Sequence, residues 1–270
     1  MTIRKEITAA NVFRCLILSI FLCGHAAAQI PMESTLPGMK KCYRICKRNG
    51  KPAGYALSEV VGCERIAGDT LVVSQLEQEF DKHGAPLTDE AGVAWPADTI
   101  QVRIVGDCVV YSYEDLLGTL GEPLFGDPKL REKLREKGYA CRFRCEGDKE
   151  YRIPSKMEAG DTLSRFLQED YLCNEKKGKP FAGATTEVIT YVACRETLDT
   201  PAGRFECVKV VTAFTCEAKV SFIRLRMKET IAVWVASGIG FVRMGVLNKK
   251  GGLRSGYFEL ERLEMPASEG

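Results

Sequence analysis

The sequence predicts a mainly β protein, in which successive antiparallel hairpins form one sheet and a single short helix interrupts them. One turn signal, polar residues followed by a glycine, recurs four times between strand-like runs, at 47–51, 81–85, 175–179 and 248–252. Such a glycine can take positive φ, as a short hairpin loop requires. Because no regular alternation of strands with helices is visible, the pattern favours a hairpin meander over a βαβ fold.

Alternating or β-branched runs predict the strands between these turns. The segment 219–228 alternates apolar and basic residues over most of its length, which predicts one strand with a buried face and a solvated face. Residues 187–194, 205–216 and 231–235 are further runs rich in β-branched and aromatic residues, so we expect strands there as well.

One helix is expected among the strands. Asp127 suits the N-cap position, and a proline follows it at the first helical position. Leu130 and Leu134 are one helical turn apart on the same face, and Gly138 stands where a helix would end. These signals predict a short α-helix over 128–137.

Residues 1–28 have the three-part layout of a secretory signal peptide. Basic residues precede an apolar run at 15–23, and small residues lead up to Ala28. A membrane span takes roughly 20 apolar residues, so this shorter run does not favour an anchor. We expect cleavage between Ala28 and Gln29 and export to the periplasm or beyond. The mature chain, 29–270, is expected to be a single β-rich domain without a transmembrane segment.

The charges of the mature chain are expected to balance. Residues 1–28 hold three of the 38 basic and one of the 36 acidic residues, which leaves 35 of each. Nucleic-acid-binding proteins usually carry a basic excess or a basic stripe, so nucleic acid is not an expected partner. The basic cluster at 40–51 flanks a turn, and we interpret it as a solvated turn.

Few residues of the mature chain suit catalysis. Its one histidine, His83, lies in a predicted hairpin turn, whereas Ser-His-Asp and Cys-His mechanisms hold an imidazole firmly against a nucleophile. The nucleophile-elbow, P-loop and dinucleotide-binding patterns are absent from the sequence. We therefore predict no catalytic residue, no cofactor and no enzymatic activity. A hydrolase that uses paired carboxylates remains an alternative, because many acidic pairs are available.

Ten cysteines follow the predicted cleavage site, and an even number in an exported chain suggests disulfides. If Thr200 and Pro201 form the centre of a hairpin turn, Cys194 and Cys207 lie opposite each other, within disulfide reach. A slip of the register would separate them. The alternative is a pair of buried thiols on neighbouring strands, which pack as small apolar groups.

Four other cysteines share a spacing, in the pairs Cys42 with Cys46 and Cys141 with Cys145. On a strand, the members of such a pair lie on one face about 13 Å apart, which is too far for one metal ion, so no metal site is predicted. If the two strands pair antiparallel, disulfides from Cys42 to Cys145 and from Cys46 to Cys141 become possible.

Two segments of the chain resemble a known family of secreted bacterial proteins. Residues 200–210 are similar to the signature T-P-A-G-x-F-x-C-x-K, and residues 233–243 to a W-x-A-x-G-x-G-x-V strand that a terminal hairpin follows. The family is the TapB-like family, or domain of unknown function 3108-like, whose members are mostly exported envelope proteins of Bacteroidetes-type bacteria. The matching residues are Thr200, Pro201, Ala202, Gly203, Phe205, Cys207, Trp234, Gly238, Gly240 and Tyr257.

The resemblance implies a mostly antiparallel sheet that is strongly curved or barrel-like, and it implies no reaction. Its motif residues also have a purely structural interpretation. Pro201 and Gly203 would form a tight turn, and Gly238 and Gly240 would let a strand bend sharply after Trp234, as the corner of a barrel requires.

The leading functional hypothesis is a non-enzymatic envelope protein, a binding or scaffolding module whose curved sheet could hold an apolar small molecule or a lipid. The first alternative is a structural or assembly partner of another envelope protein, which docks by a sheet edge or by the segment 118–140. An exposed apolar patch beside a filled core would favour this alternative. Two inward carboxylates roughly 5–9.5 Å apart in a cleft would favour the hydrolase.

Overall fold

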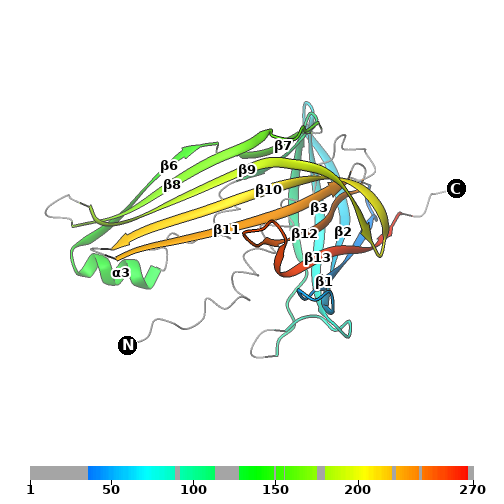
Figure 1. Ribbon diagram of the computed structural model, residues 1–270, viewed down its shortest axis with the longest axis horizontal. Coiled ribbons are helices and arrows are strands. Elements are labelled where there is room, and N and C mark those ends of the chain that lie inside the picture. Colours follow the sequence, from blue (N-terminus) through cyan, green and yellow to red (C-terminus); the bar gives the residue numbers. More distant parts are fainter. Residues whose placement is uncertain are drawn as a thin grey trace.

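The computed structural model shows one large antiparallel sheet and one short helix (Figure 1). It describes residues 36–88, 92–112, 128–148, 150–154, 156–174, 180–220, 223–236 and 239–266. The strands are β1 (Lys40–Cys46), β2 (Pro52–Ala67), β3 (Thr70–Asp81), β4 (Asp98–Val105), β5 (Cys108–Ser112), β6 (Tyr139–Gly147), β7 (Glu150–Pro154), β8 (Thr162–Asn174), β9 (Pro180–Thr200), β10 (Gly203–Val220), β11 (Ile223–Ala236), β12 (Gly240–Leu247) and β13 (Leu253–Glu264). The helix is α3 (Pro128–Glu136). The predicted fold class is thus confirmed.

The thirteen strands follow the order β6-β8-β9-β10-β11-β12-β13-β1-β2-β3-β4-β5-β7. Most neighbours in the sheet are also neighbours in the sequence, as a meander requires. The two edge strands, β6 and β7, are almost consecutive in the chain, since β6 ends at Gly147 and β7 begins at Glu150. The chain therefore passes from one edge of the sheet to the other within a short turn, and the sheet curls strongly without closing by hydrogen bonds between its edges.

The long strands extend well beyond the rolled part of the sheet (Figure 1). We call this extension the wing; it consists of β6, β8 and the adjoining lengths of β9 (180–191), β10 (212–220) and β11 (223–230). Strand β12 pairs with β11 only from Ile231 onward, so within the described part of the chain β11 forms one border of the wing.

The inward side chains of the rolled part pack into a single core cluster. Val242, Met244 and Leu260 are completely buried in it. Tyr43 contacts the ring of Phe241 at 4.7 Å between centroids and donates a hydrogen bond to the carbonyl oxygen of the same residue at 3.4 Å. The core of the rolled part is thus filled by its own side chains.

Three of the four predicted glycine turns are present as expected. Gly50, Gly84 and Gly251 have φ angles of 77°, 83° and 79°, the left-handed conformation that these loops need. The fourth signal, 175–179, lies outside the described residues. His83 is exposed in its turn, where its backbone N–H donates a hydrogen bond to Asp81 Oδ1 at 2.8 Å.

The predicted helix is confirmed, with an end one residue earlier than expected. The N–H of Gly138, whose φ is 76°, donates to the carbonyl oxygen of Arg135 at 2.9 Å and closes the helix. Leu134 packs against Leu172 and Ala182, so the helix covers part of the wing. Asp127 and the side chain of Leu130 lie outside the described residues, as does the predicted signal peptide with its cleavage site. Within the described residues no helix has the length and hydrophobicity to cross a membrane.

Two expectations for the strands are wrong. The segment 219–228 is not one strand, because β10 ends at Val220 and β11 begins at Ile223. Its apolar face is also not buried: the exposed fractions of Leu225 and Met227 are 64% and 53%. The alternation in the sequence correctly separates the two faces, but among the described residues no second layer covers Leu225 and Met227.

Contrary to the expectation from the sequence, Gly240 does not bend a strand. Strand β11 ends at Ala236 and β12 begins at Gly240, with a φ of 81°, so a hairpin turn lies there. Gly238 is outside the described residues. The turn at Pro201 and Gly203 is present as predicted.

The predicted disulfides are wrong. Thr200 lies opposite Gly203, so Pro201 and Ala202 form the centre of the turn and the register shifts. Cys207 therefore lies opposite Glu196, and Cys194 lies opposite Lys209. Strands β1 and β6 are not neighbours, which separates Cys42 and Cys46 from Cys141 and Cys145. The nine cysteines with described side chains are free: Cys42, Cys46, Cys63, Cys108, Cys145, Cys173, Cys194, Cys207 and Cys216.

Candidate functional site

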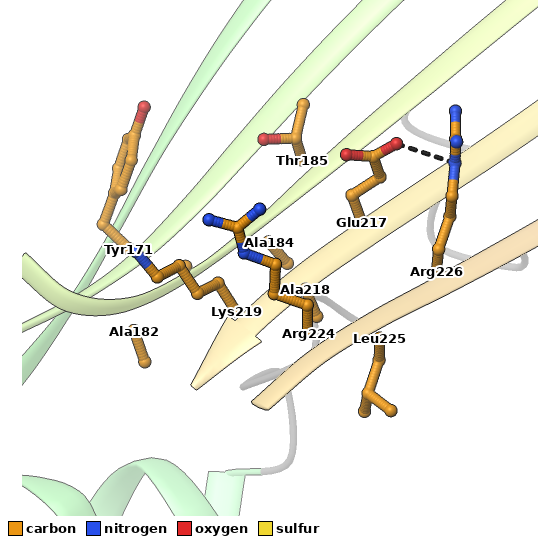
Figure 2. A pocket seen from close by; sticks show the side chains of 11 residues that line it. Tyr171, Ala182, Ala184, Thr185, Glu217, Ala218, Lys219, Arg224, Leu225 and Arg226 are labelled. Atoms are coloured by element: carbon orange, nitrogen blue, oxygen red, sulfur yellow. Dashed lines mark ion pairs between the residues drawn. The ribbon is translucent and has the colours of Figure 1, made fainter. Parts of the chain in front are cut away.

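A groove with a volume of about 570 Å³ lies near the tip of the wing. Figure 2 shows Tyr171, Thr185, Glu217 and Arg226 pointing to one side of the sheet, while Leu225 points to the other. Side chains alternate between the two faces of a strand, so the even-numbered residues of β11 from Arg224 to Trp234 share one face. The side of the wing that carries the groove therefore continues the outer face of the rolled part. Strands β8, β9, β10 and β11 together build the site.

Gly183 forms the floor of this groove. It lies opposite Tyr171 of β8 and Lys219 of β10, so larger side chains stand on both sides of it. A Cβ atom on Gly183 would come within 3.1 Å of the carbonyl oxygen of Asp170 and 3.4 Å of the Tyr171 ring. A glycine at this position therefore keeps the groove open.

The groove carries more positive than negative charge. Glu217 lies opposite Arg226 and forms an ion pair with it at 2.8 Å, although both side chains are more than half exposed and the pair adds at most about 1 kcal/mol. Lys219 lies opposite Arg224, and within the described part of the chain neither forms an ion pair. Two like charges directly opposite on neighbouring strands destabilise a sheet. An anion bound between Lys219 and Arg224 would relieve that repulsion.

Tyr171 supplies an aromatic wall and a hydroxyl group. A hydrogen bond with Glu169 raises the pKa of Tyr171, so the phenol stays neutral at physiological pH. The groove thus combines two unpaired cations, one aromatic ring and a glycine floor, which suits a ligand with a negatively charged group.

A second hollow of about 470 Å³ lies on the rolled part, lined by Cys42, Tyr55, Glu261 and Arg262. Its acidic and basic side chains balance, so it does not select for charge. Burial raises the pKa of the Cys42 thiol, which makes it a weak nucleophile near neutral pH. This hollow therefore has fewer side chains that could select a ligand than the groove of the wing.

Trp234 of the family motif lies on the outer face of the rolled part, beside the curled β9–β10 hairpin that carries Thr200 and Gly203 (Figure 1). Arg243 Nη2 donates to the carbonyl oxygen of Asp199 at 3.0 Å, and Trp234 Nε1 donates to Glu196. The ammonium group of Lys209 stands 4.8 Å from the centre of the Trp234 ring. The motif therefore fixes the hairpin to the sheet, in line with its structural interpretation.

Glu259 joins this region to β1. It is 4% exposed and accepts hydrogen bonds from Arg44 Nη2 at 2.8 Å and from Arg243 Nε at 3.0 Å. On the same strand, the centre of the Tyr257 ring lies 5.9 Å from the guanidinium carbon of Arg243. One buried carboxylate thus holds two arginines, a contact that neither the sequence pattern nor the family signature predicted.

Two buried ionisable side chains, Lys41 and Glu77, lie inside the rolled part. Burial lowers the pKa of Lys41 to about 8, and burial also raises the pKa of Glu77 well above its usual range, although the charge of Lys41 opposes that rise. Asp98 and Glu79 are near enough to raise the pKa of Glu77 further. These carboxylates come nearest to what a hydrolase would need, but structural ion pairs perturb pKa values in the same way. Among the described residues no cluster of three or more metal-ligand side chains occurs.

The comparisons with known proteins agree with the fold. Residues 137–260 match the model of the DUF3108-like family, and this stretch contains the whole groove. The comparison with curated proteins gives no match.

Two crystal structures share the fold. One is of a presumed exported protein with a YmcC-like fold from Bacteroides fragilis, with a TM-score of 0.51 and 19% identity over 90% of this chain and 100% of the other. The second is of a presumed lipoprotein from Parabacteroides distasonis, with a TM-score of 0.51 and 14% identity over 90% of this chain and 99% of the other. The family resemblance seen in the sequence is confirmed over residues 137–260, which match the DUF3108-like model.

Proposed function

We propose that this chain is a non-enzymatic envelope protein that binds an anionic partner in the groove of the wing. The observation that carries the proposal is the register that places Lys219 opposite Arg224, with no ion pair to either side chain among the described residues. A sheet gains nothing from this arrangement by itself. The open floor at Gly183 leaves room for a ligand group beside these two cations.

The polar side chains described in the groove favour binding over catalysis. Its one carboxylate, Glu217, is engaged by Arg226, and its phenol, Tyr171, is held neutral. The hydrogen bond with Glu169 makes the phenol less acidic than a free tyrosine, which does not favour it as a nucleophile. Export is supported by the signal-peptide layout of residues 1–28. An exported binding protein of this family would find its partner in the cell envelope.

Reversing the two unpaired charges is expected to abolish most of the binding. In the variant Lys219→Glu/Arg224→Glu, the affinity for hexaglutamate, used as a short acidic probe, should fall by about tenfold or more. Binding by the unaltered chain should also weaken as salt is added, because the attraction acts between exposed charges. Isothermal titration calorimetry at low and high salt measures both effects.

The control is Lys249→Glu/Lys250→Glu, which makes the same change in net charge on an exposed hairpin turn. Its affinity for hexaglutamate should stay within about threefold of the unaltered chain, because these lysines do not line the groove. Equal losses in the two variants would show that the probe responds only to net charge, and the proposed site would be wrong.

A further inference from the structure

One border of the wing is an unpaired strand edge. Strand β11 pairs with β10 along its whole length, from Ile223 to Ala236, but with β12 only from Ile231 to Ala236. In the part of the chain that the structure describes, residues 223–230 therefore have a strand on one side only. Every second residue of such an edge directs its N–H and C=O groups outward, which leaves about four donors and four acceptors available.

The two faces of this edge differ sharply. Leu225 and Met227 are exposed on the inner face, and Arg224, Arg226 and Lys228 are exposed on the outer face. Basic residues on an edge strand often serve to prevent unwanted pairing. That function explains the outer face but not two large apolar side chains exposed beside it.

A second strand, β2, also extends beyond its neighbour, and the edge of this overhang is protected by its irregular shape. Residues 61–67 of β2 extend beyond β1 and also carry exposed apolar side chains, Val61 and Ile66. Two register shifts interrupt that overhang, next to Gly62 and Ala67, and bulges of this kind turn an edge away from new partners. The β10–β11 ladder has fourteen pairs and no register shift, so its edge stays regular.

Charge decides which kind of strand fits this edge. A second copy of the chain, paired antiparallel about Arg226, would bring Arg224 opposite Lys228 and Arg226 opposite itself, and like charges destabilise such pairs. A strand with acidic residues on one face would instead meet the basic outer face. Apolar residues at the alternate positions would cover Leu225 and Met227.

We infer that residues 223–230 of β11 bind an extended segment of another envelope protein, in which acidic and apolar residues alternate, and that this segment adds to the sheet as a further strand. The inference rests on the proposed function and names the partner and the binding mode. Main-chain hydrogen bonds supply affinity, and the two faces of β11 supply selectivity. The groove takes acidic side chains of the same segment, because Arg224 belongs to both the groove and the edge.

The test uses a short capped peptide of alternating glutamate and valine, with fluorescence anisotropy as the readout. Two control peptides have the same composition: one in block order, and one with N-methyl groups on the alternate amides that would face β11. Both should bind about tenfold more weakly or worse, since the first cannot present two faces and the second cannot form the main-chain hydrogen bonds.

Matched variants locate the site. The variant Leu225→Ser/Met227→Ser should bind the alternating peptide with about tenfold lower affinity. The variant Val61→Ser/Ile66→Ser, at residues of similar exposure, should change this affinity by less than about twofold. Hexaglutamate should bind a Met227→Ser variant as it binds the unaltered chain, because Met227 does not line the groove. That result separates the two proposals, because the groove can bind an anion even if the edge binds no strand.

The inference is overturned if the N-methylated peptide binds as well as its parent. It is also overturned if the chain forms a concentration-dependent dimer through this edge, or if anionic phosphatidylglycerol vesicles bind at Leu225 and Met227 while the peptide does not. If the unaltered chain binds the alternating peptide but not hexaglutamate, the groove is not an anion-binding site, whereas the inference about the strand edge stands.

Discussion

Replacement of Glu259 by alanine is expected to lower the free energy of unfolding by about 3–5 kcal/mol, because it leaves two arginines without their shared carboxylate in a nearly buried site. Glu259 is the acceptor for both Arg44 and Arg243. Among the described residues, the buried Nε atom of Arg44 has no hydrogen-bond partner, so the loss is not easily compensated. Chemical denaturation of the unaltered chain and the variant measures the difference.

Glu187→Ala provides the control for this prediction. Glu187 forms an ion pair with Arg165 at 2.7 Å, but the arginine side chain is 69% exposed. An exposed pair of this kind contributes at most about 1 kcal/mol. If the two variants lose the same stability, the buried network under the β9–β10 hairpin does not stabilise the fold as described.

Gly147→Ala is expected to destabilise the fold more than an alanine substitution at a glycine with a similar backbone angle in open space. Gly147 ends β6, where the chain passes to the opposite edge of the sheet, and its φ is 100°. A Cβ atom there would lie 2.3 Å from the carbonyl oxygen of Arg165, which is part of the backbone and cannot rotate away. Crowding of this kind costs about 1–3 kcal/mol, in addition to the strain of the backbone angle.

Gly160→Ala separates these two costs. Its φ of 99° is nearly the same as that of Gly147, but no atom of the described residues lies within 4 Å of the added Cβ. We expect Gly147→Ala to lose about 1–3 kcal/mol more than Gly160→Ala in the same denaturation experiment. Equal losses would mean that β6 and β8 can separate at this end without penalty.

Local signals explain why much of the fold could be predicted. The glycine turns and the helix termini depend on residues close together in the sequence, so Gly50, Gly84 and Gly251 were identified from their neighbours alone. The β10–β11 turn was missed because Ser221 and Phe222 carry no glycine, proline or asparagine signal. The strand was therefore extended across it.

Register and exposure could not be read from local patterns. One residue decides whether Thr200 or Ala202 belongs to the centre of the turn, and that choice moved Cys194 away from Cys207. The alternation along β11 separates its faces, but whether Leu225 is covered depends on other layers of the structure. The groove depends on three strands that bring Tyr171, Gly183 and Lys219 together, and no single stretch of sequence contains that arrangement.

The central claim is that the wing, and no other basic region, binds an anionic partner. An NMR titration of the isotopically labelled chain with hexaglutamate tests it most directly. The account predicts that the largest changes in amide shift occur at Gly183, Lys219 and Arg224. Changes concentrated in the basic segment 40–51, or spread evenly over the lysines and arginines of the surface, would contradict it.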